Sequence, residues 1–578
     1  MNNEEMEFQS DGNGAALLLV SRSAGEEYEQ LGCTMLGAFH HLGIPYKLRD
    51  VDDGCPSAKE LSGYACVILG QAHFGKILGQ SGAKALKDAV EMGVGLVSFD
   101  GDLGGYSAPF AEIFKINIGH APVSCSGIKT VNTDHYITGT RELDDDLALE
   151  KSIEVWPVES PHHGFSKASP LQTPSNWPVV INAVCGKGRA VLFTCPARLW
   201  TADVLGHAYG LDDVFWKSIV WAARKPFAIY AMPPFTTAVM DDCSGSYNHF
   251  RYVDVMNEHG WLPHLEIYLE DIDRVMHYED YADSKKLKRL YDGGLAEIGI
   301  HGLTYNNLMW FDHHGRKPLS DEALAKNFEI YDACLKKWGI KPSRAENMHF
   351  GEIGRNALPY LKARGIEYMS MVLPFDTAWM DVPANKPPLQ FPGPYHLRGY
   401  YRGYLPEDPH FFIARSCLDQ KDFSSTAPAP YVDYLWNNTI FWDESLRTNI
   451  ERAAQTAVLQ VRRGIDARFY GMSVAHEQRV AVISMEEWEQ LYAAIDNGLK
   501  KYDIIHRSWE YICDYCRSHY DSRIKSVNVN HESGKVSCQM HGKTNLTTAL
   551  EIYTNNGAGV TCQSRDVPPF TGAASVET

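Results

Sequence analysis

The amino-acid sequence predicts an α/β protein that ends in a short all-β region. Apolar runs of strand length alternate with amphipathic helical patterns from Ala15 to about Phe227, and again from Thr236 to about Cys516. Such alternation is typical of parallel strands covered by helices. After Ser522 apolar and polar residues alternate, which predicts half-buried strands. A chain of 578 residues is too long for one core, and we predict domains at 15–228, 229–518 and 519–578.

The first region has the pattern of a doubly wound parallel sheet. Apolar runs predict strands at 15–20, 46–51, 65–70, 95–99 and 190–194, and helical periodicity predicts helices at 26–42, 82–92 and 214–224. Pro226, Pro233 and Pro234 follow. Because proline restricts the backbone and removes an N–H donor, these residues mark the boundary of the region.

The second region repeats the strand-and-helix unit over a longer stretch. We predict strands at 263–269, 296–300 and 368–372, and helices at 284–291, 321–338 and 357–364. Repeated units of this kind suit a barrel of parallel strands, complete or distorted.

The third region has a different pattern. Strands are predicted at 524–530, 535–539 and 549–553, with Asn, Gly and Pro between them, which favours a small β-sandwich.

Composition limits the partners and the compartment. The net charge of −18, without a Lys/Arg-rich run, argues against nucleic acid and against an anionic membrane surface. No apolar run reaches the roughly 20 residues that a membrane span needs. The first residues are acidic and polar, unlike a secretory signal, and the thirteen scattered cysteines suit free thiols in a reducing compartment. We therefore predict a cytoplasmic protein.

Adjacent carboxylates mark the centre of the second region. The run Val239-Met240-Asp241-Asp242-Cys243 reads as a buried strand that delivers both acids to its C-terminal end, and α/β folds build their sites at that edge. Two ionised carboxylates repel each other, so such a pair usually holds a cation or shares a proton. A pair that only caps a turn is the alternative.

Two histidines have a similar place. Glu297-Ile-Gly-Ile-His301 and Gly471-Met-Ser-Val-Ala-His476 are short apolar strands that end in histidine. Between them lies the segment Arg344 to Glu352, which contains His349 and two further acids.

Together these segments resemble the polysaccharide deacetylase family, metal hydrolases with a barrel-like α/β fold, over roughly Thr236 to Tyr511. The resemblance implies that Asp241 is the general base, Asp242 and His301 are metal ligands, and His476 is the general acid. The sequence departs from the family where Cys243 replaces a glycine. It also departs where Tyr305 occupies the position of a second ligand histidine.

The third metal ligand is therefore open. Zinc prefers three protein ligands from His and carboxylate, with one position left for water. The candidates are His349, His313, His314, Tyr305 and Asn306. We favour His349, because it lies in the segment Arg344 to Glu352 together with Glu346 and Glu352. Neutral tyrosine is a poor zinc ligand. Zinc, or another divalent metal, is the expected cofactor.

The first region resembles glutamine-amidotransferase-like domains in its pattern. The turn in which that family places its nucleophilic cysteine reads Asp100-Gly-Asp-Leu-Gly-Gly105 here. Without a nucleophile, the resemblance implies an accessory or assembly domain. Association of two copies of the chain through this domain stays open.

The leading functional hypothesis is a metal-dependent hydrolase that removes an N-acetyl, or else an O-acetyl, group from a sugar or polysaccharide. The aromatic segments 395–404 and 431–442 suit sugar stacking, and they suit packed aromatics equally. Two alternatives remain. One is a metal-independent hydrolase of amides or cyclic amides on the same fold. The other is a carbohydrate-binding or assembly protein with an inactive domain.

Overall fold

The computed structural model describes residues 9–577 apart from 120, 144–145, 160–170, 175, 202, 208–209, 246–247, 273–283, 305, 371–373, 379–380, 382–401, 415–449, 478–483 and 557–558. The described residues form two compact units. The first holds those up to 231 and from 518 onward, and the second holds those from 232 to 517. The strands after 518 thus share a unit with the N-terminal strands. The division into three domains stays a prediction.

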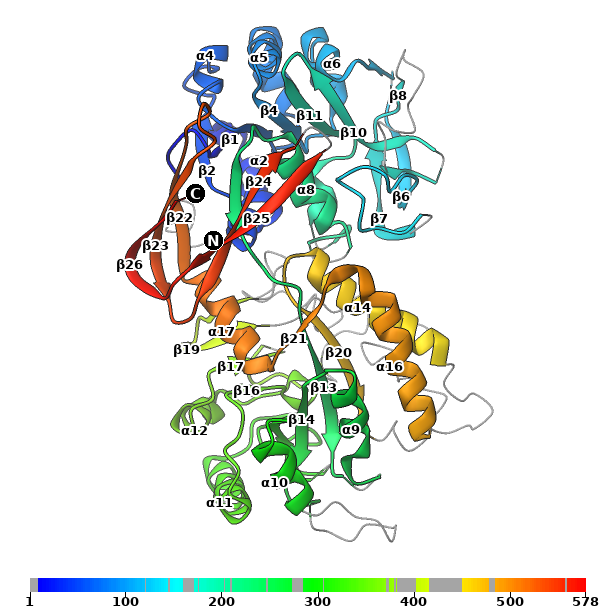
Figure 1. The fold of residues 1–578 in the computed structure, drawn as a ribbon, viewed down its shortest axis with the longest axis vertical. Helices are drawn as coiled ribbons and strands as arrows, with labels where there is room; N and C mark the ends of the chain where they lie inside the picture. The colour runs from blue at the N-terminus through cyan, green and yellow to red at the C-terminus, as the bar shows by residue number, and fades with distance from the viewer. Residues whose placement is uncertain are drawn as a thin grey trace. The chain divides into compact units, whose positions relative to one another are not determined.

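A mixed sheet forms the centre of the first unit (Figure 1). Among the described residues it has nine strands in the order β2-β1-β3-β4-β11-β10-β9-β6-β7. Their bounds are β1 (Ala16–Val20), β2 (Tyr46–Asp50), β3 (Cys66–Leu69), β4 (Gly95–Ser98), β6 (Val123–Thr130), β7 (Asp146–Val155), β9 (Leu171–Gln172), β10 (Pro178–Cys185) and β11 (Gly188–Phe193). A short pair, β5 (Asn117–Ile118) and β8 (Val158–Glu159), lies outside it.

The prediction of a parallel sheet is right for one half of this sheet and wrong for the other. Strands β2, β1, β3, β4 and β11 run parallel, whereas β10, β9, β6 and β7 pair antiparallel. The change of direction occurs at a tight hairpin, in which Gly186 has a φ of 57°. Glycine adopts such a left-handed backbone at little cost, so β10 turns directly into β11 without a crossover helix.

Helices cover both faces of this sheet. They are α2 (Glu26–Leu31), α3 (Gly37–Leu42), α4 (Ala58–Leu61), α5 (Phe74–Glu91), α6 (Ala108–Phe114) and α8 (Asp212–Ala222). Leu86 of α5 and Phe110 of α6 share a core with Leu17 and Leu96 of the sheet. On the other face, Phe215 of α8 stacks on Phe99 with ring centroids 4.6 Å apart. This is the doubly wound arrangement that alternating strands and helices predict.

The C-terminal strands form two small antiparallel sheets in the first unit. The strands are β22 (Ser522–Val529), β23 (Val536–Thr544), β24 (Thr548–Asn555), β25 (Val560–Val567) and β26 (Phe570–Glu577). One sheet has the order β22-β23-β26, and the other has the order β12-β24-β25. The strand β12 (Phe227–Tyr230) spans the predicted boundary between residues 228 and 229. Apolar residues of both sheets share one core.

The second unit is built on parallel strands. Strands β13 (Phe235–Cys243), β14 (Pro263–Tyr268), β15 (Glu297–Gly302), β20 (Gly471–His476) and β21 (Ile505–His506) form one sheet, in which every pairing is parallel. A second sheet joins β16 (Ala345–Glu346), β17 (Tyr368–Met369), β19 (Asp408–Ala414) and β18 (Arg402–Leu405). The predicted strands at 263–269 and 296–300 are confirmed. Of the predicted strand at 368–372 the structure has Tyr368–Met369, and residues 371 and 372 lie outside the described residues. A closed barrel stays a prediction.

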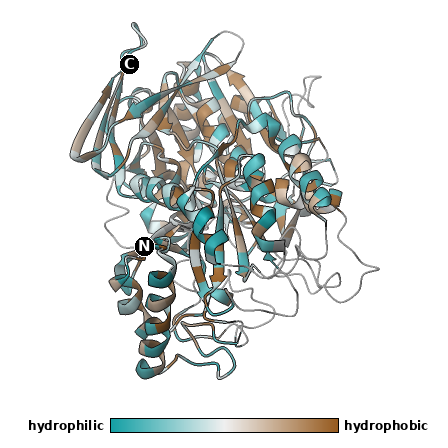
Figure 2. Cartoon of the chain, turned by 60° about the horizontal axis from the view of Figure 1, so that its bottom comes forward, coloured by the Kyte–Doolittle hydropathy of each residue, from teal (hydrophilic) through white to brown (hydrophobic). Residues whose placement is uncertain are grey.

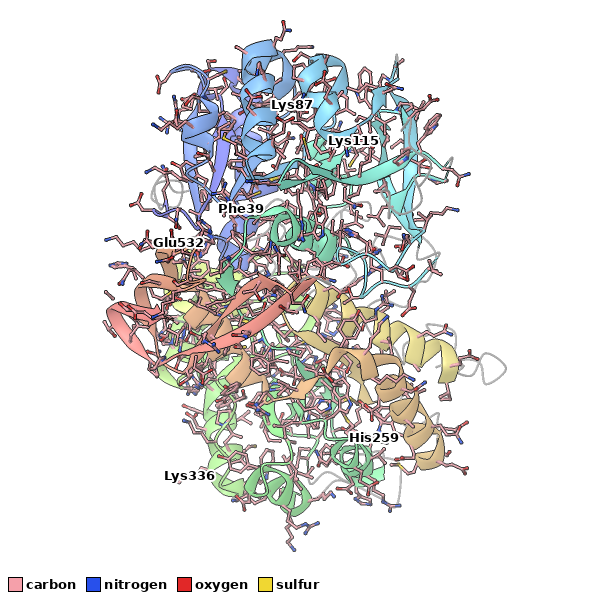
Figure 3. All side chains as sticks on the ribbon, turned by 45° about the horizontal axis from the view of Figure 1, so that its top comes forward. Phe39, Lys87, Lys115, His259, Lys336 and Glu532 are labelled. Carbon is pink, nitrogen blue, oxygen red and sulfur yellow. The ribbon has the colours of Figure 1, made fainter. Side chains whose placement is uncertain are left out.

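The second unit also contains helices, and one of them has clear signals at both ends. They are α9 (Arg251–Glu258), α10 (Ser284–Asp292), α11 (Asp321–Trp338), α12 (Leu358–Ala363), α14 (Ile450–Asp466), α16 (Met485–Leu499) and α17 (Trp509–Tyr520). Ser320 caps α11 and Gly339 ends it with a φ of 65°. His259, labelled in Figure 3, follows α9. It contacts Asp496 and Glu489 of α16 at 2.6 and 2.9 Å.

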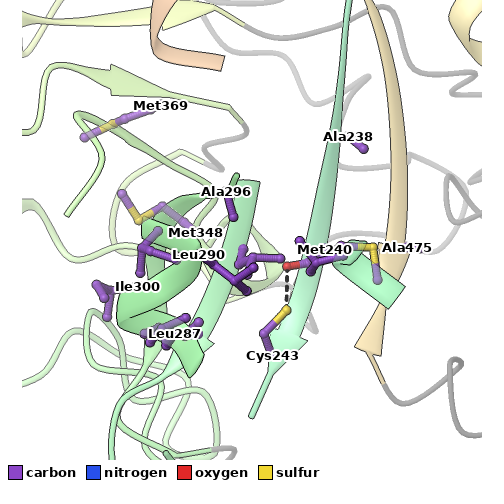
Figure 4. Packing of buried hydrophobic residues seen from close by; sticks show 14 of the residues in the cluster. Ala238, Met240, Cys243, Leu287, Leu290, Ala296, Ile300, Met348, Met369 and Ala475 are labelled. Atoms are coloured by element: carbon purple, nitrogen blue, oxygen red, sulfur yellow. Dashed lines mark hydrogen bonds between the residues drawn. The ribbon is translucent and has the colours of Figure 1, made fainter. Parts of the chain in front are cut away.

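Many helices carry apolar residues on one face and polar residues on the other, so they show mixed colours in Figure 2. The apolar faces of the second unit meet in a core that includes Met240, Ile300 and Met348, close to the strand ends (Figure 4). No described helix combines the length and the apolar character that crossing a lipid bilayer requires.

A buried ion pair in the first unit gives the first prediction. Arg141 and Asp213 lie 3.1 Å apart, with 4% and 0% of their side chains exposed. Replacing Asp213→Ala leaves a buried guanidinium without its carboxylate, and we expect a loss of about 3–5 kcal/mol in the free energy of unfolding. Urea unfolding measures this loss.

Asp203→Ala is the matched control, because Asp203 pairs with Lys151 and Arg198 at the surface. Exposed pairs contribute about 0–1 kcal/mol. If both variants lost the same free energy of unfolding, burial would not be the reason for the contribution of Asp213.

Candidate metal centre

The parallel strands of the second unit end at one edge of their sheet, and polar side chains gather there. Asp241 and Asp242 lie at the end of β13, and His301 lies at the end of β15. His476 ends β20 and is the register partner of Asp241. His349 comes from a short turn, η6 (His349–Gly351), after β16. The structure thus brings together the residues that the sequence singled out.

The backbone at Asp242 explains how two consecutive acids reach the same site. Neighbouring side chains of a regular strand point to opposite faces. Asp242 has a φ of 55°, and the pairing of β13 with β14 shifts register between Met240 and Cys243. Such a bulge re-aims a side chain. Asp is among the residues that tolerate the left-handed region best.

Asp242, His301 and His349 form a buried group in which one possible ligand atom of each lies within 4.8 Å of the others. Oδ1 of Asp242 is 3.3 Å from Nε2 of His301 and 3.6 Å from Nε2 of His349. Ligand atoms about 2.0–2.1 Å from a tetrahedral zinc ion stand roughly 3.4 Å apart. The donor set and its spacing therefore fit a divalent metal such as zinc.

The charges of this group depend on one another. Burial raises the pKa of Asp242, but contacts with His301, His349 and His476 outweigh it and hold that pKa well below its usual value. Burial, together with the neighbouring His301, lowers the pKa of His349 to about 3. The neutral imidazole that a metal ligand needs is thus the stable form of His349.

Asp241 is held by an amide. The side-chain Nδ2 of Asn347 lies 3.0 and 3.1 Å from the two carboxylate oxygens of Asp241 and donates to them. Burial raises the pKa of Asp241, although His301 and His476 oppose this shift. A carboxylate with a raised pKa accepts a proton near neutral pH more readily than an ordinary one.

The other ligand candidates lie in different surroundings. His313 faces both oxygens of Glu352 at 3.0 and 2.8 Å, and His314 and Asn306 are exposed. Tyr305 lies outside the described residues. Arg344 pairs with Glu510 and Asp514. Among the described residues, the metal-ligand group contains only Asp242, His301 and His349.

Sequence reasoning missed several residues that support the site. The Tyr268 hydroxyl donates to Oδ1 of Asp242 at 2.6 Å. Asn347 donates to Asp241, and Glu266 lies beside His301. One signal was available: His264 and Glu266 stand two residues apart in an apolar strand, so they share one face of it.

No protein-family model matches the chain, and no curated protein matches it. Among solved structures, a protein assigned as a polysaccharide deacetylase from Mycobacterium smegmatis is 12% identical, with a TM-score of 0.34, over 50% of this chain and 91% of its own. The Bc1960 peptidoglycan N-acetylglucosamine deacetylase is 10% identical, with a TM-score of 0.28, over 49% of this chain and 90% of its own.

A third similar structure is the exo-β-1,4-mannosidase Op5Man5 from Opitutaceae bacterium strain TAV5. It is 14% identical over 32% of this chain, with a TM-score of 0.23, and the match spans 31% of the mannosidase. The structural neighbours thus include polysaccharide deacetylases.

A buried carboxylate holds the turn that follows the two aspartates. Glu477 accepts from the backbone N–H groups of Ser244 and Gly245 at 2.6 and 2.8 Å, and from the hydroxyl of Tyr252 at 3.1 Å. Burial raises the pKa of Glu477 to about 7, although these donors oppose the shift.

This raised pKa predicts a pH dependence of stability. The pKa of a glutamate in the unfolded chain is about 4.3, so between about pH 4.5 and pH 7 the folded protein binds a proton that the unfolded chain lacks. The free energy of unfolding therefore falls as pH rises through this window. Glu477→Gln removes that contribution. Urea unfolding of the metal-free proteins at pH 5 and pH 8 measures this fall. We expect the free energy of unfolding to fall less between the two pH values for the variant than for the wild type. Equal falls would contradict the raised pKa of Glu477.

Proposed function

We propose that this chain is a metal-dependent hydrolase that removes an acetyl group, N-acetyl foremost, from a sugar or polysaccharide. The observation that carries the proposal is the buried group of Asp242, His301 and His349, with ligand atoms within 4.8 Å of one another. Asp241 and His476 lie beside it as register partners on adjacent strands. The acetylated-sugar part of the proposal rests on the resemblance to polysaccharide deacetylases in the sequence.

Asp242, His301 and His349 would hold the metal. They offer one carboxylate and two imidazoles, which leaves a fourth position of a tetrahedral site open. A zinc ion bound there would polarise the acyl carbonyl and lower the pKa of a water molecule towards neutrality. Tyr268 donates to Oδ1 of Asp242, which fixes the orientation of this carboxylate.

Asp241 is the general base in this mechanism. Its carboxylate takes a proton from water as the water oxygen forms a bond to the acyl carbon. Asn347 donates to both carboxylate oxygens and so holds them in place. Because burial raises the pKa of Asp241, its proton affinity is closer to that required at neutral pH.

His476 is the general acid. Its side chain is half-buried, whereas Asp241 and Asp242 are buried. His476 gives a proton to the amide nitrogen while the carbon–nitrogen bond breaks, so that one water and one acetamido group yield acetate and a free amine. The segments 431–442 and most of 395–404, which suit sugar stacking by sequence, lie outside the described residues.

Acetate release from N-acetylhexosamine oligomers tests the proposal. We expect the wild-type protein to release acetate, to lose this activity after chelation, and to regain it when zinc is added. Asp241→Asn should lower kcat by about 10²–10⁴-fold, because the base is lost, while the metal content stays at the wild-type level. Asp254→Asn is the control, since Asp254 pairs with Lys286 at the surface, and it should leave kcat unchanged.

Other results would overturn the proposal in different ways. Acetate release that persists after complete metal removal would favour the metal-independent amide hydrolase. Sugar binding without acetate release would favour the carbohydrate-binding or assembly protein. Full activity of Asp241→Asn would exclude Asp241 as the base.

A further inference from the structure

A row of ionisable side chains lies in the interior beside the metal-ligand group. His264 and Glu266 of β14 are 0% exposed, Glu346 of β16 is 1% exposed and His301 is 2% exposed. Burying charged groups costs free energy unless they are paired. An apolar strand would avoid this cost, so the row calls for an explanation beyond packing.

Glu266 is the centre of the row. Its Oε1 accepts from the backbone N–H of Asn347 at 2.7 Å and faces Nε2 of His264 at 2.9 Å. Its Oε2 lies 3.8 Å from Nδ1 of His301. Neither Oε2 of Glu266 nor Nδ1 of His301 has a hydrogen-bond partner among the described residues. A shift of about 1 Å would bring these two buried atoms to hydrogen-bond distance.

The neighbouring strand leaves room for this arrangement. Gly299 of β15 is the register partner of Glu266. A Cβ atom at Gly299 would stand 2.4 Å from Nε2 of His264 and 2.8 Å from Oε1 of Glu266. Contacts this short are not tolerated, so any other residue at position 299 would displace the pair. The position of Glu266 therefore depends on glycine at position 299.

We propose that Glu266 is a positioning residue that orients the metal ligand His301, by holding the proton of its imidazole on Nδ1 and leaving Nε2 to face Asp242 and the metal. This inference rests on the metal site of the proposed function. Ligand histidines commonly give their second N–H to a carboxylate, which fixes both the tautomer and the ring. Oε2 of Glu266 is the acceptor placed for this task.

Glu266→Gln separates orientation from packing. The amide oxygen of glutamine can still accept from Asn347 and His264, so its NH₂ group would face Nδ1 of His301. A donor at that position requires Nδ1 to be an acceptor, which moves the imidazole proton to Nε2. Nε2 is the atom that the metal needs, so the variant should bind metal more weakly although its size is unchanged.

The experiment measures zinc affinity by competition with a chromophoric chelator, together with the visible spectrum of the cobalt(II)-loaded protein. We expect Glu266→Gln to weaken zinc binding by about 10–100-fold and to change the cobalt spectrum. Gly299→Ala displaces the same pair without altering a polar group, and it should weaken zinc binding too. Gly299→Ala carries the test if Glu266→Gln does not fold.

Glu297→Gln is the matched control. Glu297 accepts from the backbone N–H groups of Trp509 and Glu510 at 2.7 and 3.1 Å, and it lies 3.5 Å from Nδ1 of His264. It has no contact with His301 among the described residues. We expect wild-type zinc affinity and an unchanged cobalt spectrum for this variant.

The outcomes distinguish this inference from the proposed function. If the wild-type protein binds neither zinc nor cobalt, the metal site itself is wrong. If the wild type binds zinc and both Glu266→Gln and Gly299→Ala bind it equally well, the role of Glu266 is overturned while the metal site stands. Equal weakening by Glu297→Gln would also overturn it, because the effect would then belong to any carboxylate that contacts His264.

Discussion

The left-handed backbone of Asp242 is the constraint on which the site depends. A regular strand would send Asp241 and Asp242 to opposite faces, and only one of them would reach the strand-end histidines. With a φ of 55°, Asp242 turns towards His301 and His349 while Asp241 stays beside His476. Such a conformation costs about 1–3 kcal/mol, which the surrounding contacts must offset. Glu477 binds the backbone of the next turn, and Tyr268 binds the Asp242 carboxylate.

The polar interior behind the site has a related origin. His264, Glu266 and Glu346 lie where a sheet of this kind normally has Val, Ile or Leu. Nearby, Met240, Ile300 and Met348 supply the apolar packing (Figure 4). The second unit thus combines an apolar core with a row of buried ionisable side chains that ends at His301. In the proposed role of Glu266, the arrangement of the ligands depends on a residue that never touches the metal.

Much of the fold was predictable because periodicity and strand ends are local properties. The strands that carry Asp241, His301 and His476 follow from short apolar runs, and parallel strands place their ends at one edge. The antiparallel pairing of β10 with β11 was missed because it depends on a hairpin at Gly186. The strand at Phe227 pairs with residues more than 300 positions later, at Tyr553, and no local pattern reveals such a pairing. His349 lies in a turn and not at the end of a strand, so no apolar run predicts its position. The backbone of Asp242 and the contacts of Glu266 are properties of the folded chain alone.

The proposed mechanism requires Asp242, His301 and His349 to hold one divalent metal ion. Anomalous diffraction from crystals grown with zinc, recorded on both sides of the zinc absorption edge, locates such an ion. We expect one strong peak at about 2.0–2.2 Å from Oδ1 of Asp242 and from one nitrogen of each histidine. Zinc-loaded crystals with no peak there, or with the peak at His313 and His314, would contradict it.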